Sequence, residues 1–189
     1  MIDALKNVFS RSGVIIILCL VLLLSFDMAA QEYVQDQSRT EVKFRVKNMG
    51  ISVNGTFEKS EFVVSFDESS LTESSVKVKI HIESIDTGNS KRDKDLKKKK
   101  YFDLEKYPYL EFNSTSFKKN DQGQVSMVGN LKIKDVEKEV EIPLAVKEEE
   151  GGITLSTVYE LNRRDFKVGG KSFTMSDTVE IDVSFHGIK

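Results

Sequence analysis

The sequence predicts an all-β fold, a single antiparallel eight-stranded barrel with one short helix in a long crossover. Apolar and polar residues alternate over most of the chain after residue 31, which is the pattern of half-buried strands. These segments follow one another at hairpin spacing with almost no helical pattern between them. Each segment has one apolar and one polar face, so the sheet must close on itself or pack face to face. Closure into a barrel also removes exposed edges.

Residues 1–30 have the composition of a signal peptide. Lys6 and Arg11 precede an apolar run over residues 14–24, and small residues follow the run. The run is shorter than the roughly 20 apolar residues that span a bilayer. We therefore expect cleavage after Ala30 and a periplasmic or secreted mature protein. The alternative is an uncleaved membrane anchor.

Residues 31–189 fit one domain. The only cysteine, Cys19, lies in the apolar run, so the mature chain can form neither a disulfide nor a thiolate metal site. Its stability must come from an apolar core. The formal net charge of −2 gives no global basicity that would indicate nucleic-acid binding.

Alternating segments lie on both sides of the crossover. Those before it have apolar or small residues at every second position, over residues 42–46, 53–57, 62–66 and 76–82. Those after it cover residues 112–117, 125–133, 140–146, 153–155, 159–161 and 179–185. Gly55 suggests a bend or bulge at a corner of the barrel, because a glycine inside a strand often marks such a place.

The shared alternation predicts which side chains point into the barrel. The expected inward set is Phe44, Val46, Phe57, Phe62, Phe66, Val78, Ile80, Leu131, Ile133, Ile142, Leu144 and Leu155. A barrel of eight strands is either filled by its own side chains or holds one small ligand. The alternation alone does not distinguish these two outcomes.

Residues 83–112 interrupt the alternation and form the long crossover. Ser90 is the expected N-cap of a short helix over residues 91–96. Irregular loops of this length in compact domains are usually functional. We expect residues 87–109 to form the lid or rim of a ligand entrance, with its mouth lined by Phe102, Tyr107 and Tyr109. The competing account is that these rings only cap the end of the barrel.

A run of lysines over residues 97–100 is the strongest local charge feature, and further basic residues precede it. One interpretation is a solvated loop face that nearby aspartates partly neutralise. The other is attraction to an anionic lipid head group or membrane surface, with Arg92, Lys97 and Lys98 as the candidate head-group or rim residues.

Arg92 and Asp93 also have a structural interpretation. Within one helical turn beside the barrel mouth they would pair with Asp165 and Arg164 and pin the crossover to the barrel. We favour this role for both residues.

Catalytic and metal-binding motifs are not evident in the sequence. His81 and His186 are both expected at the surface, and no spacing of histidines or cysteines suggests zinc. Residues 170–172 look like the end of a phosphate-binding loop, but Asp165 stands where that motif needs glycine, so we interpret them as a hairpin turn. We predict a non-catalytic protein that needs no metal or cofactor.

Several ordered motifs carry a family resemblance. Among them are V-N-G-T-F at residues 53–57, S-I-D-T-G at 84–88, Y-F-D at 101–103, V-G-N-L-K-I-K-D-V at 128–136 and R-D-F at 164–166. In this order the chain resembles the YceI-like family of polyisoprenoid-binding proteins, from residue 31 onward. It departs from the family where Asn48 and Asp95 stand in place of the usual histidines.

The resemblance implies an elongated, lipocalin-like barrel with an apolar tunnel for a long isoprenoid chain. It implies an exported binding protein that holds a polyisoprenoid or similar amphiphilic lipid for transport, storage or sequestration. A bound isoprenoid quinone is compatible with the same interior. Burying one methylene contributes about 0.8 kcal/mol, so a few isoprene units outweigh an association cost of about 4 to 15 kcal/mol.

The alternative function is a ligand-free structural or interaction barrel. Such a barrel would dock a protein or membrane surface through its lysine-rich crossover. Transient contact with a membrane surface is compatible with either function, neither involves nucleic acid, and the sequence leaves the oligomeric state open.

Overall fold

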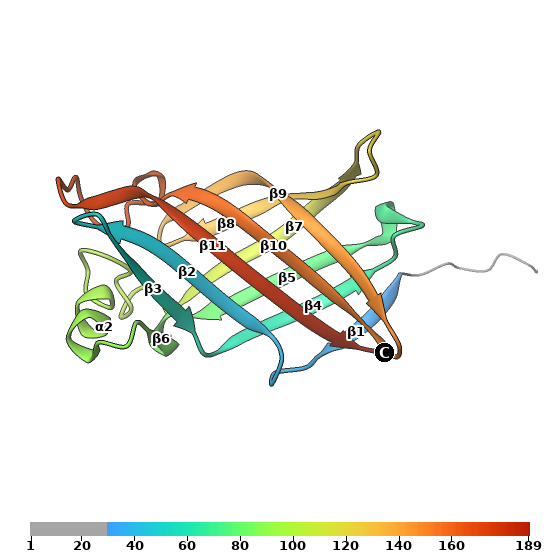
Figure 1. Ribbon diagram of the computed structural model, residues 1–189, viewed down its shortest axis with the longest axis horizontal. Coiled ribbons are helices and arrows are strands. Elements are labelled where there is room, and N and C mark those ends of the chain that lie inside the picture. Colours follow the sequence, from blue (N-terminus) through green and yellow to red (C-terminus); the bar gives the residue numbers. More distant parts are fainter. Residues whose placement is uncertain (1–29) are drawn as a thin grey trace, which may run out of the picture.

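The computed structural model describes residues 30–189, which form a closed antiparallel barrel (Figure 1). The ring closes because β1 pairs with both β4 and β11. This confirms the predicted eight-stranded barrel. In spatial order its strands are β1 (Gln31–Gln35), β4 (Ser60–Phe66), β5 (Ser75–His81), β7 (Tyr109–Lys119), β8 (Val125–Ile133), β9 (Val136–Glu149), β10 (Gly152–Asn162) and β11 (Met175–Ile188).

Three further strands extend the wall at one end of the barrel. β2 (Glu41–Asn48) follows β1 along the chain and pairs with β11, β3 (Ile51–Phe57) pairs with β2, and the short β6 (Ile85–Asp86) pairs with β3. Helix α2 (Ser90–Leu96) lies beside them in the crossover (Figure 1). The 3₁₀ turns are η1 (Leu71–Glu73), η2 (Ile82–Ser84) and η3 (Arg163–Phe166).

We call the end of the barrel that carries α2, the β2–β3 turn and the β10–β11 loop the open end. The opposite end, where β4 joins β5, β7 joins β8 and β9 joins β10, is the closed end. In Figure 1 the open end lies on the left and the closed end on the right. The crossover belongs entirely to the open end.

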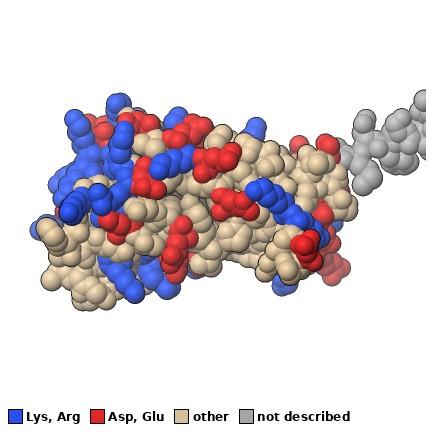
Figure 2. Space-filling model, turned by 90° about the horizontal axis from the view of Figure 1, so that it is seen from above, with Lys and Arg blue, Asp and Glu red and all other residues tan. Residues whose placement is uncertain are grey.

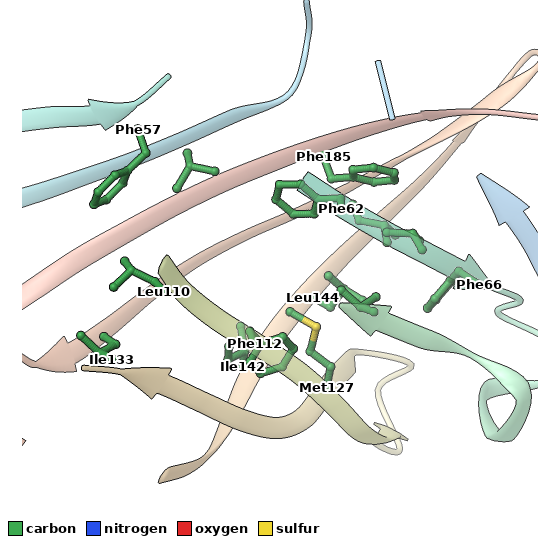
Figure 3. Close-up of a cluster of buried hydrophobic side chains, with 14 of the residues drawn as sticks. Phe57, Phe62, Phe66, Leu110, Phe112, Met127, Ile133, Ile142, Leu144 and Phe185 are labelled. Atoms are coloured by element: carbon green, nitrogen blue, oxygen red, sulfur yellow. The ribbon is translucent and has the colours of Figure 1, made fainter. Parts of the chain in front are cut away.

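The core follows the alternation that predicts the strands. Of the expected inward set, Phe57, Phe62, Phe66, Ile133, Ile142, Leu144 and Leu155 are buried. Phe44, Val78, Ile80 and Leu131 are partly buried and pack against this cluster, and Val46 is also partly buried. Figure 3 shows ten of the buried side chains converging from several strands. The period of two therefore identifies the inner face of the barrel correctly.

Gly55 does not mark a bulge, which corrects the expectation from the sequence. The ladder between β2 and β3 runs through Gly55 without a register shift. A Cβ at this position would overlap the ring of Phe44 and lie 2.9 Å from the Thr87 methyl group. The glycine is required because an aromatic ring packs directly on the backbone. The register does shift elsewhere, between Ser114 and Ser116.

The ladder between β9 and β10 is short. It pairs residues 145–149 with residues 152–156 near the closed end, and nearer the open end β9 pairs with β8 while β10 pairs with β11. Pro143 lies just beyond the last pair and has no N–H to donate. Lys138 and Asp165 form an ion pair of 3.3 Å between β9 and η3 in this part of the wall.

All strands of the ring and all residues of the core cluster lie within residues 31–188. A segment with its own hydrophobic core is what defines a single domain. The predicted signal peptide, residues 1–30, lies almost wholly outside the described residues. Among residues 30–189, no helix combines the length and the apolar character needed to cross a bilayer.

Candidate functional site

Two small apolar cavities lie inside the barrel. The inner cavity, of about 130 Å³, is lined by side chains such as Phe62, Val78 and Leu131. The middle cavity, of about 100 Å³, lies nearer the crossover and is lined by residues that include Phe102. The two cavities are neighbours, because five residues line both: Phe57, Leu110, Ile133, Leu161 and Ile181.

An outer pocket of about 300 Å³ continues this series to the surface at the open end. Its apolar walls are shared with the middle cavity and consist of Phe44, Val46, Leu96, Tyr101 and Met175. Its remaining walls are mostly polar and come from the crossover and the end of β2: Asn48, Thr87, Asn89, Lys91, Arg92 and Asp95, with Val53. The series therefore changes from polar at the surface to apolar inside.

Aromatic rings separate the members of this series. The ring centroids of Phe44 and Phe57 are 5.5 Å apart, and Phe57 meets Phe102 edge to face at 6.2 Å. Phe44 lines the outer pocket and the middle cavity, while Phe57 lines the middle and inner cavities. Phe44 and Phe57 therefore lie at the boundaries between the three spaces.

Thr87 holds the crossover in place through Arg92 and Asp93. The Arg92 guanidinium donates to the Thr87 hydroxyl and carbonyl oxygens, both at 2.7 Å, and the Thr87 N–H donates to the Asp93 carboxylate at 3.0 Å. Asn89, not Ser90, caps α2, because its side-chain oxygen accepts from the Lys91 and Arg92 N–H groups. The predicted cap is therefore displaced by one residue.

The predicted pairing of Arg92 and Asp93 with Asp165 and Arg164 is wrong. Arg164 instead contacts Asp177 at 3.1 Å, and Asp165 contacts Lys138. The reason is local geometry. Thr87, five residues before Arg92, offers two oxygen acceptors within reach. These hydrogen bonds therefore join the helix of the crossover to the start of the crossover and not to the barrel.

Arg163 is a buried residue that the sequence interpretation missed. Its side chain is only 3% exposed and donates to the carbonyl oxygens of Val168, Gly170 and Ser176 and to the Asp177 carboxylate. It also lines the middle cavity. Arg163 thus fixes the β10–β11 loop against the open end. The R-D-F motif begins one residue later and does not reveal this role.

The crossover aromatics divide between two environments. Phe102 lines the middle cavity, further inside than the predicted mouth, and Tyr101 lines both this cavity and the outer pocket. Tyr109 lies on the outer wall, where its ring meets the ring of His81 at 4.9 Å. Tyr107 is beside Lys106, 5.0 Å from its amino group, and lines none of the three spaces.

The predicted place of Tyr109 and Tyr107 at the mouth is therefore wrong. Leu110 is buried and faces Ile133 across the ladder, so the strand alternation turns Tyr109 outward. Of the predicted rim cations, Arg92 lines the outer pocket whereas Lys97 and Lys98 do not. Lys98 instead contacts Asp95 at 2.6 Å, and this hydrogen bond lowers the pKa of the Asp95 carboxyl.

Two hydroxyl-bearing side chains line the otherwise apolar inner cavity. The Thr157 hydroxyl oxygen is buried and has no hydrogen-bond partner within the described part of the chain. Tyr159 is two residues further along β10, and burial raises the pKa of its phenol. An unpaired buried hydroxyl costs about 1 to 3 kcal/mol. The alternation of residues 153–161 could have identified both positions as inward.

A larger hollow lies elsewhere and has a different chemistry. It measures about 820 Å³ and lies along the ends of β7 and β8 and along β9 and β10, with charged side chains such as Lys118, Lys119 and Glu141 among its walls. Lys118 and Glu141 pair with each other at 2.7 Å. We place the site in the smaller spaces because they lead from the surface to the apolar interior of the barrel. Among residues 30–189, no group of three or more metal-ligating side chains is found.

The fold and these spaces define a closed β-barrel with an apolar interior that approaches the surface at one end. Its sequence matches the model of the YceI-like domain over residues 33–186, so the chain belongs to this family. A UPF0312 protein of Pseudomonas savastanoi pv. phaseolicola is 30% identical over 169 residues, which are 85% of this chain and 88% of the relative.

Solved structures show the same barrel. The YCEI protein of Campylobacter jejuni has 29% identity and a TM-score of 0.66, covering 84% of this chain and 98% of its own. BcnA of Burkholderia cenocepacia reaches a TM-score of 0.77 at 24% identity, over 81% of this chain and 99% of its own. A polyisoprenoid binding domain from Saccharophagus degradans has a TM-score of 0.67 at 15% identity, over 83% and 98%.

Proposed function

We propose that the protein is an exported, non-catalytic binding protein that holds a polyisoprenoid or similar amphiphilic lipid tail inside the barrel, for transport, storage or sequestration. The observation that carries this proposal is the series of outer pocket, middle cavity and inner cavity, which share their walls. The structural likeness to a polyisoprenoid binding domain supports it. Export is supported by the order of basic, apolar and small residues in residues 1–30.

The size of the cavities indicates how a tail is accommodated. The inner and middle cavities are each smaller than the roughly 300 to 1,000 Å³ of common ligand pockets. A long tail therefore enters only if Phe44 and Phe57 rotate and join the spaces. Each methylene buried on binding contributes about 0.8 kcal/mol, which opposes the cost of moving the rings. Binding of a long tail therefore requires a wider tunnel than these ring positions leave.

The polar groups of the outer pocket favour an anionic or hydrogen-bonding head group. Arg92 lines this pocket, but its guanidinium already donates to Thr87. Lys91 lines the same pocket and is exposed. Lys91 is therefore the cation that contacts a head group, while Arg92 holds the rim of the pocket in place through its hydrogen bonds to Thr87.

Organic extraction of the purified protein, followed by mass spectrometry, tests the proposal. We expect an isoprenoid lipid or isoprenoid quinone at close to one molecule per barrel. Extraction of a carefully folded, unheated sample that yields no lipid would favour the ligand-free interaction barrel instead.

A cavity-filling variant provides the matched comparison. Val183 lines the inner cavity, and Val158 is 59% exposed on the neighbouring strand. Val183→Phe adds a ring to the inner cavity and should lower lipid occupancy. Val158→Phe adds the same ring outside and should leave the occupancy unchanged.

A further inference from the structure

The open end carries an exposed apolar tip formed by two separate connections. Met49 and Ile51 flank the β2–β3 turn and are 75% and 70% exposed, and Phe173 of the β10–β11 loop is 99% exposed. The two connections lie side by side, because the Met49 N–H donates to the Thr174 carbonyl oxygen at 2.7 Å and Met175 pairs with Asn48. We call Met49, Ile51 and Phe173 the apolar tip.

The backbone of the turn makes a methionine at this place unusual. Residues 49 and 50 connect the paired residues Asn48 and Ile51, and both have positive φ, 53° at Met49 and 79° at Gly50. A turn with positive φ at both central positions favours asparagine or aspartate before the glycine. Met49 occupies that position with a large apolar side chain turned to solvent. Neither backbone geometry nor core packing accounts for this residue.

Lysines lie on the same side of the molecule as the apolar tip. The Lys171 amino group lies 5.9 Å from the centre of the Phe173 ring. The β10–β11 loop also contacts the crossover directly, because the Gly169 N–H donates to the Lys100 carbonyl oxygen and Lys134 donates to the carbonyl oxygens of Lys99 and Lys167. The lysine run of the crossover is therefore beside the same loop. Figure 2 shows Lys and Arg gathered at this end of the molecule.

The charge at this end is not balanced locally. Residues 91–100 contain seven Lys or Arg and two Asp. Within residues 30–189, Lys99, Lys100 and Lys171 have no ion-pair partner, whereas Lys98 pairs with Asp95 and Lys167 with Asp135. Three large apolar side chains with unpaired lysines beside them match the two layers of a membrane surface, where acyl chains lie below anionic head groups.

We infer that the open end docks on an anionic lipid bilayer, with Met49, Ile51 and Phe173 inserted at the boundary between head groups and acyl chains. A second copy of this chain fits the same surface poorly. A symmetric contact would bring the two lysine-rich ends face to face. A nucleic acid would meet the lysines but would leave the apolar tip without a matching surface.

Docking would bring the outer pocket close to the bilayer. Asn48 and Met175 line that pocket and adjoin the apolar tip, and Lys91 and Arg92 line its other side. A lipid tail could then pass between bilayer and barrel with little exposure to water. This consequence rests on the proposed function, but docking itself depends only on the outer surface.

Vesicle flotation with the chain from Gln31, which contains the complete ring and core, tests the inference. The vesicles are phosphatidylcholine alone, or phosphatidylcholine and phosphatidylglycerol in equal parts. We expect binding to the anionic vesicles, weaker binding at high salt because the charges are screened, and little binding to phosphatidylcholine alone. Equal binding to both vesicles, or to neither, would overturn the inference.

Matched variants separate the apolar tip and the lysines from the rest of the surface. Phe173→Ser should weaken anionic-vesicle binding about tenfold through lost insertion, whereas Val63→Ser, on the outer wall and 66% exposed, should not. Lys99→Gln with Lys100→Gln should cost about fivefold for each lysine that meets head groups. Lys118→Gln with Lys119→Gln removes the same charge at the closed end and should change nothing.

Two outcomes of these measurements would count against the inference. If Val63→Ser weakens binding as much as Phe173→Ser, the apolar tip is not the contact. If sedimentation shows a dimer that Phe173→Ser dissolves, the apolar tip binds a second copy instead of a bilayer. Neither result depends on whether the barrel holds a lipid, so failure of the docking and failure of the proposed function are distinguishable.

Discussion

The open and closed ends of the barrel share most of their strands but differ in packing and charge. At the closed end, Phe66 meets Phe117 edge to face at 5.7 Å and Phe62 stacks with Phe185 at 5.3 Å. Its connections at residues 67–74 and 148–151 carry acidic residues and no basic ones. The open end has the crossover, the lysines and the outer pocket, from which the middle and inner cavities follow into the barrel. The comparison indicates that one end maintains the fold while the other can adapt to a ligand.

Close backbone contacts reinforce the closed end. A Cβ at Gly187 would lie 2.7 Å from the Tyr33 Cβ and 2.8 Å from the Phe185 ring. Here β1 and β11 pair through Val34 and Ile188, and this pairing closes the ring. Such tight packing leaves no space for a tail at the seam between β1 and β11.

The largest effect should come from Phe185→Ala at the closed end. Phe185 is 1% exposed, and replacing a buried phenylalanine with alanine costs about 3 to 5 kcal/mol. Urea unfolding should show this loss, while the lipid content of each folded molecule stays the same. A loss below about 1 kcal/mol would contradict the role of the closed end.

Arg163→Met tests the loop of the open end. We expect a loss of about 1 to 3 kcal/mol, because four carbonyl oxygens and the Asp177 carboxylate lose their donor. Hydrogen exchange should become faster in residues 167–175 and stay unchanged in β4. Arg163→Lys should recover only part of the loss, since lysine has fewer donors and no planar guanidinium. Uniformly faster exchange would show that Arg163 supports the whole barrel instead.

Phe102→Ala distinguishes an entrance from a cap. Phe102 is partly buried, so the loss of stability should be about 2 kcal/mol, and lipid occupancy should fall because the ring lines the middle cavity. Phe117→Ala is the matched control, since Phe117 is also partly buried but packs at the closed end. If both variants lose stability and both retain full lipid occupancy, Phe102 only caps the barrel.

The smallest effect is expected for Thr157→Val in the inner cavity. This near-isosteric change removes a buried hydroxyl that has no partner in residues 30–189, so the delipidated protein should gain about 1 kcal/mol or less in thermal unfolding. A lower stability only in the lipid-loaded form would show that the hydroxyl bonds to the ligand. A loss in the delipidated form would mean that Thr157 has a structural partner.

The sequence predicts the barrel well because its strands are regular. Each strand has one face toward the core and one toward solvent, so apolar residues recur at every second position. This period of two can be read directly from the sequence, as in Phe62, Val64 and Phe66 or in Ile142 and Leu144. The same rule predicts that Tyr109 points outward once Leu110 is assigned inward. Tyr109 and Phe102 therefore face different environments, although both belong to the crossover.

The crossover could not be predicted in the same way. Arg92 and Asp93 could reach partners across the barrel or within their own loop, and only the position of Thr87 decides between them. Gly55 is similar, because the constraint on it comes from Phe44 on a neighbouring strand and not from its own segment. The apolar tip likewise joins residues that are more than a hundred positions apart in the chain. Contacts of this kind depend on tertiary structure and leave no local pattern.

The proposed function requires that a lipid tail pass from the outer pocket through the middle cavity to the inner cavity. A crystal structure of the lipid-loaded protein tests this directly. We predict continuous density along the three spaces, with the rings of Phe44 and Phe57 rotated from their positions in the ligand-free barrel. Density confined to the hollow beside Lys118 and Glu141, with Phe57 unmoved and the inner cavity empty, would contradict the account.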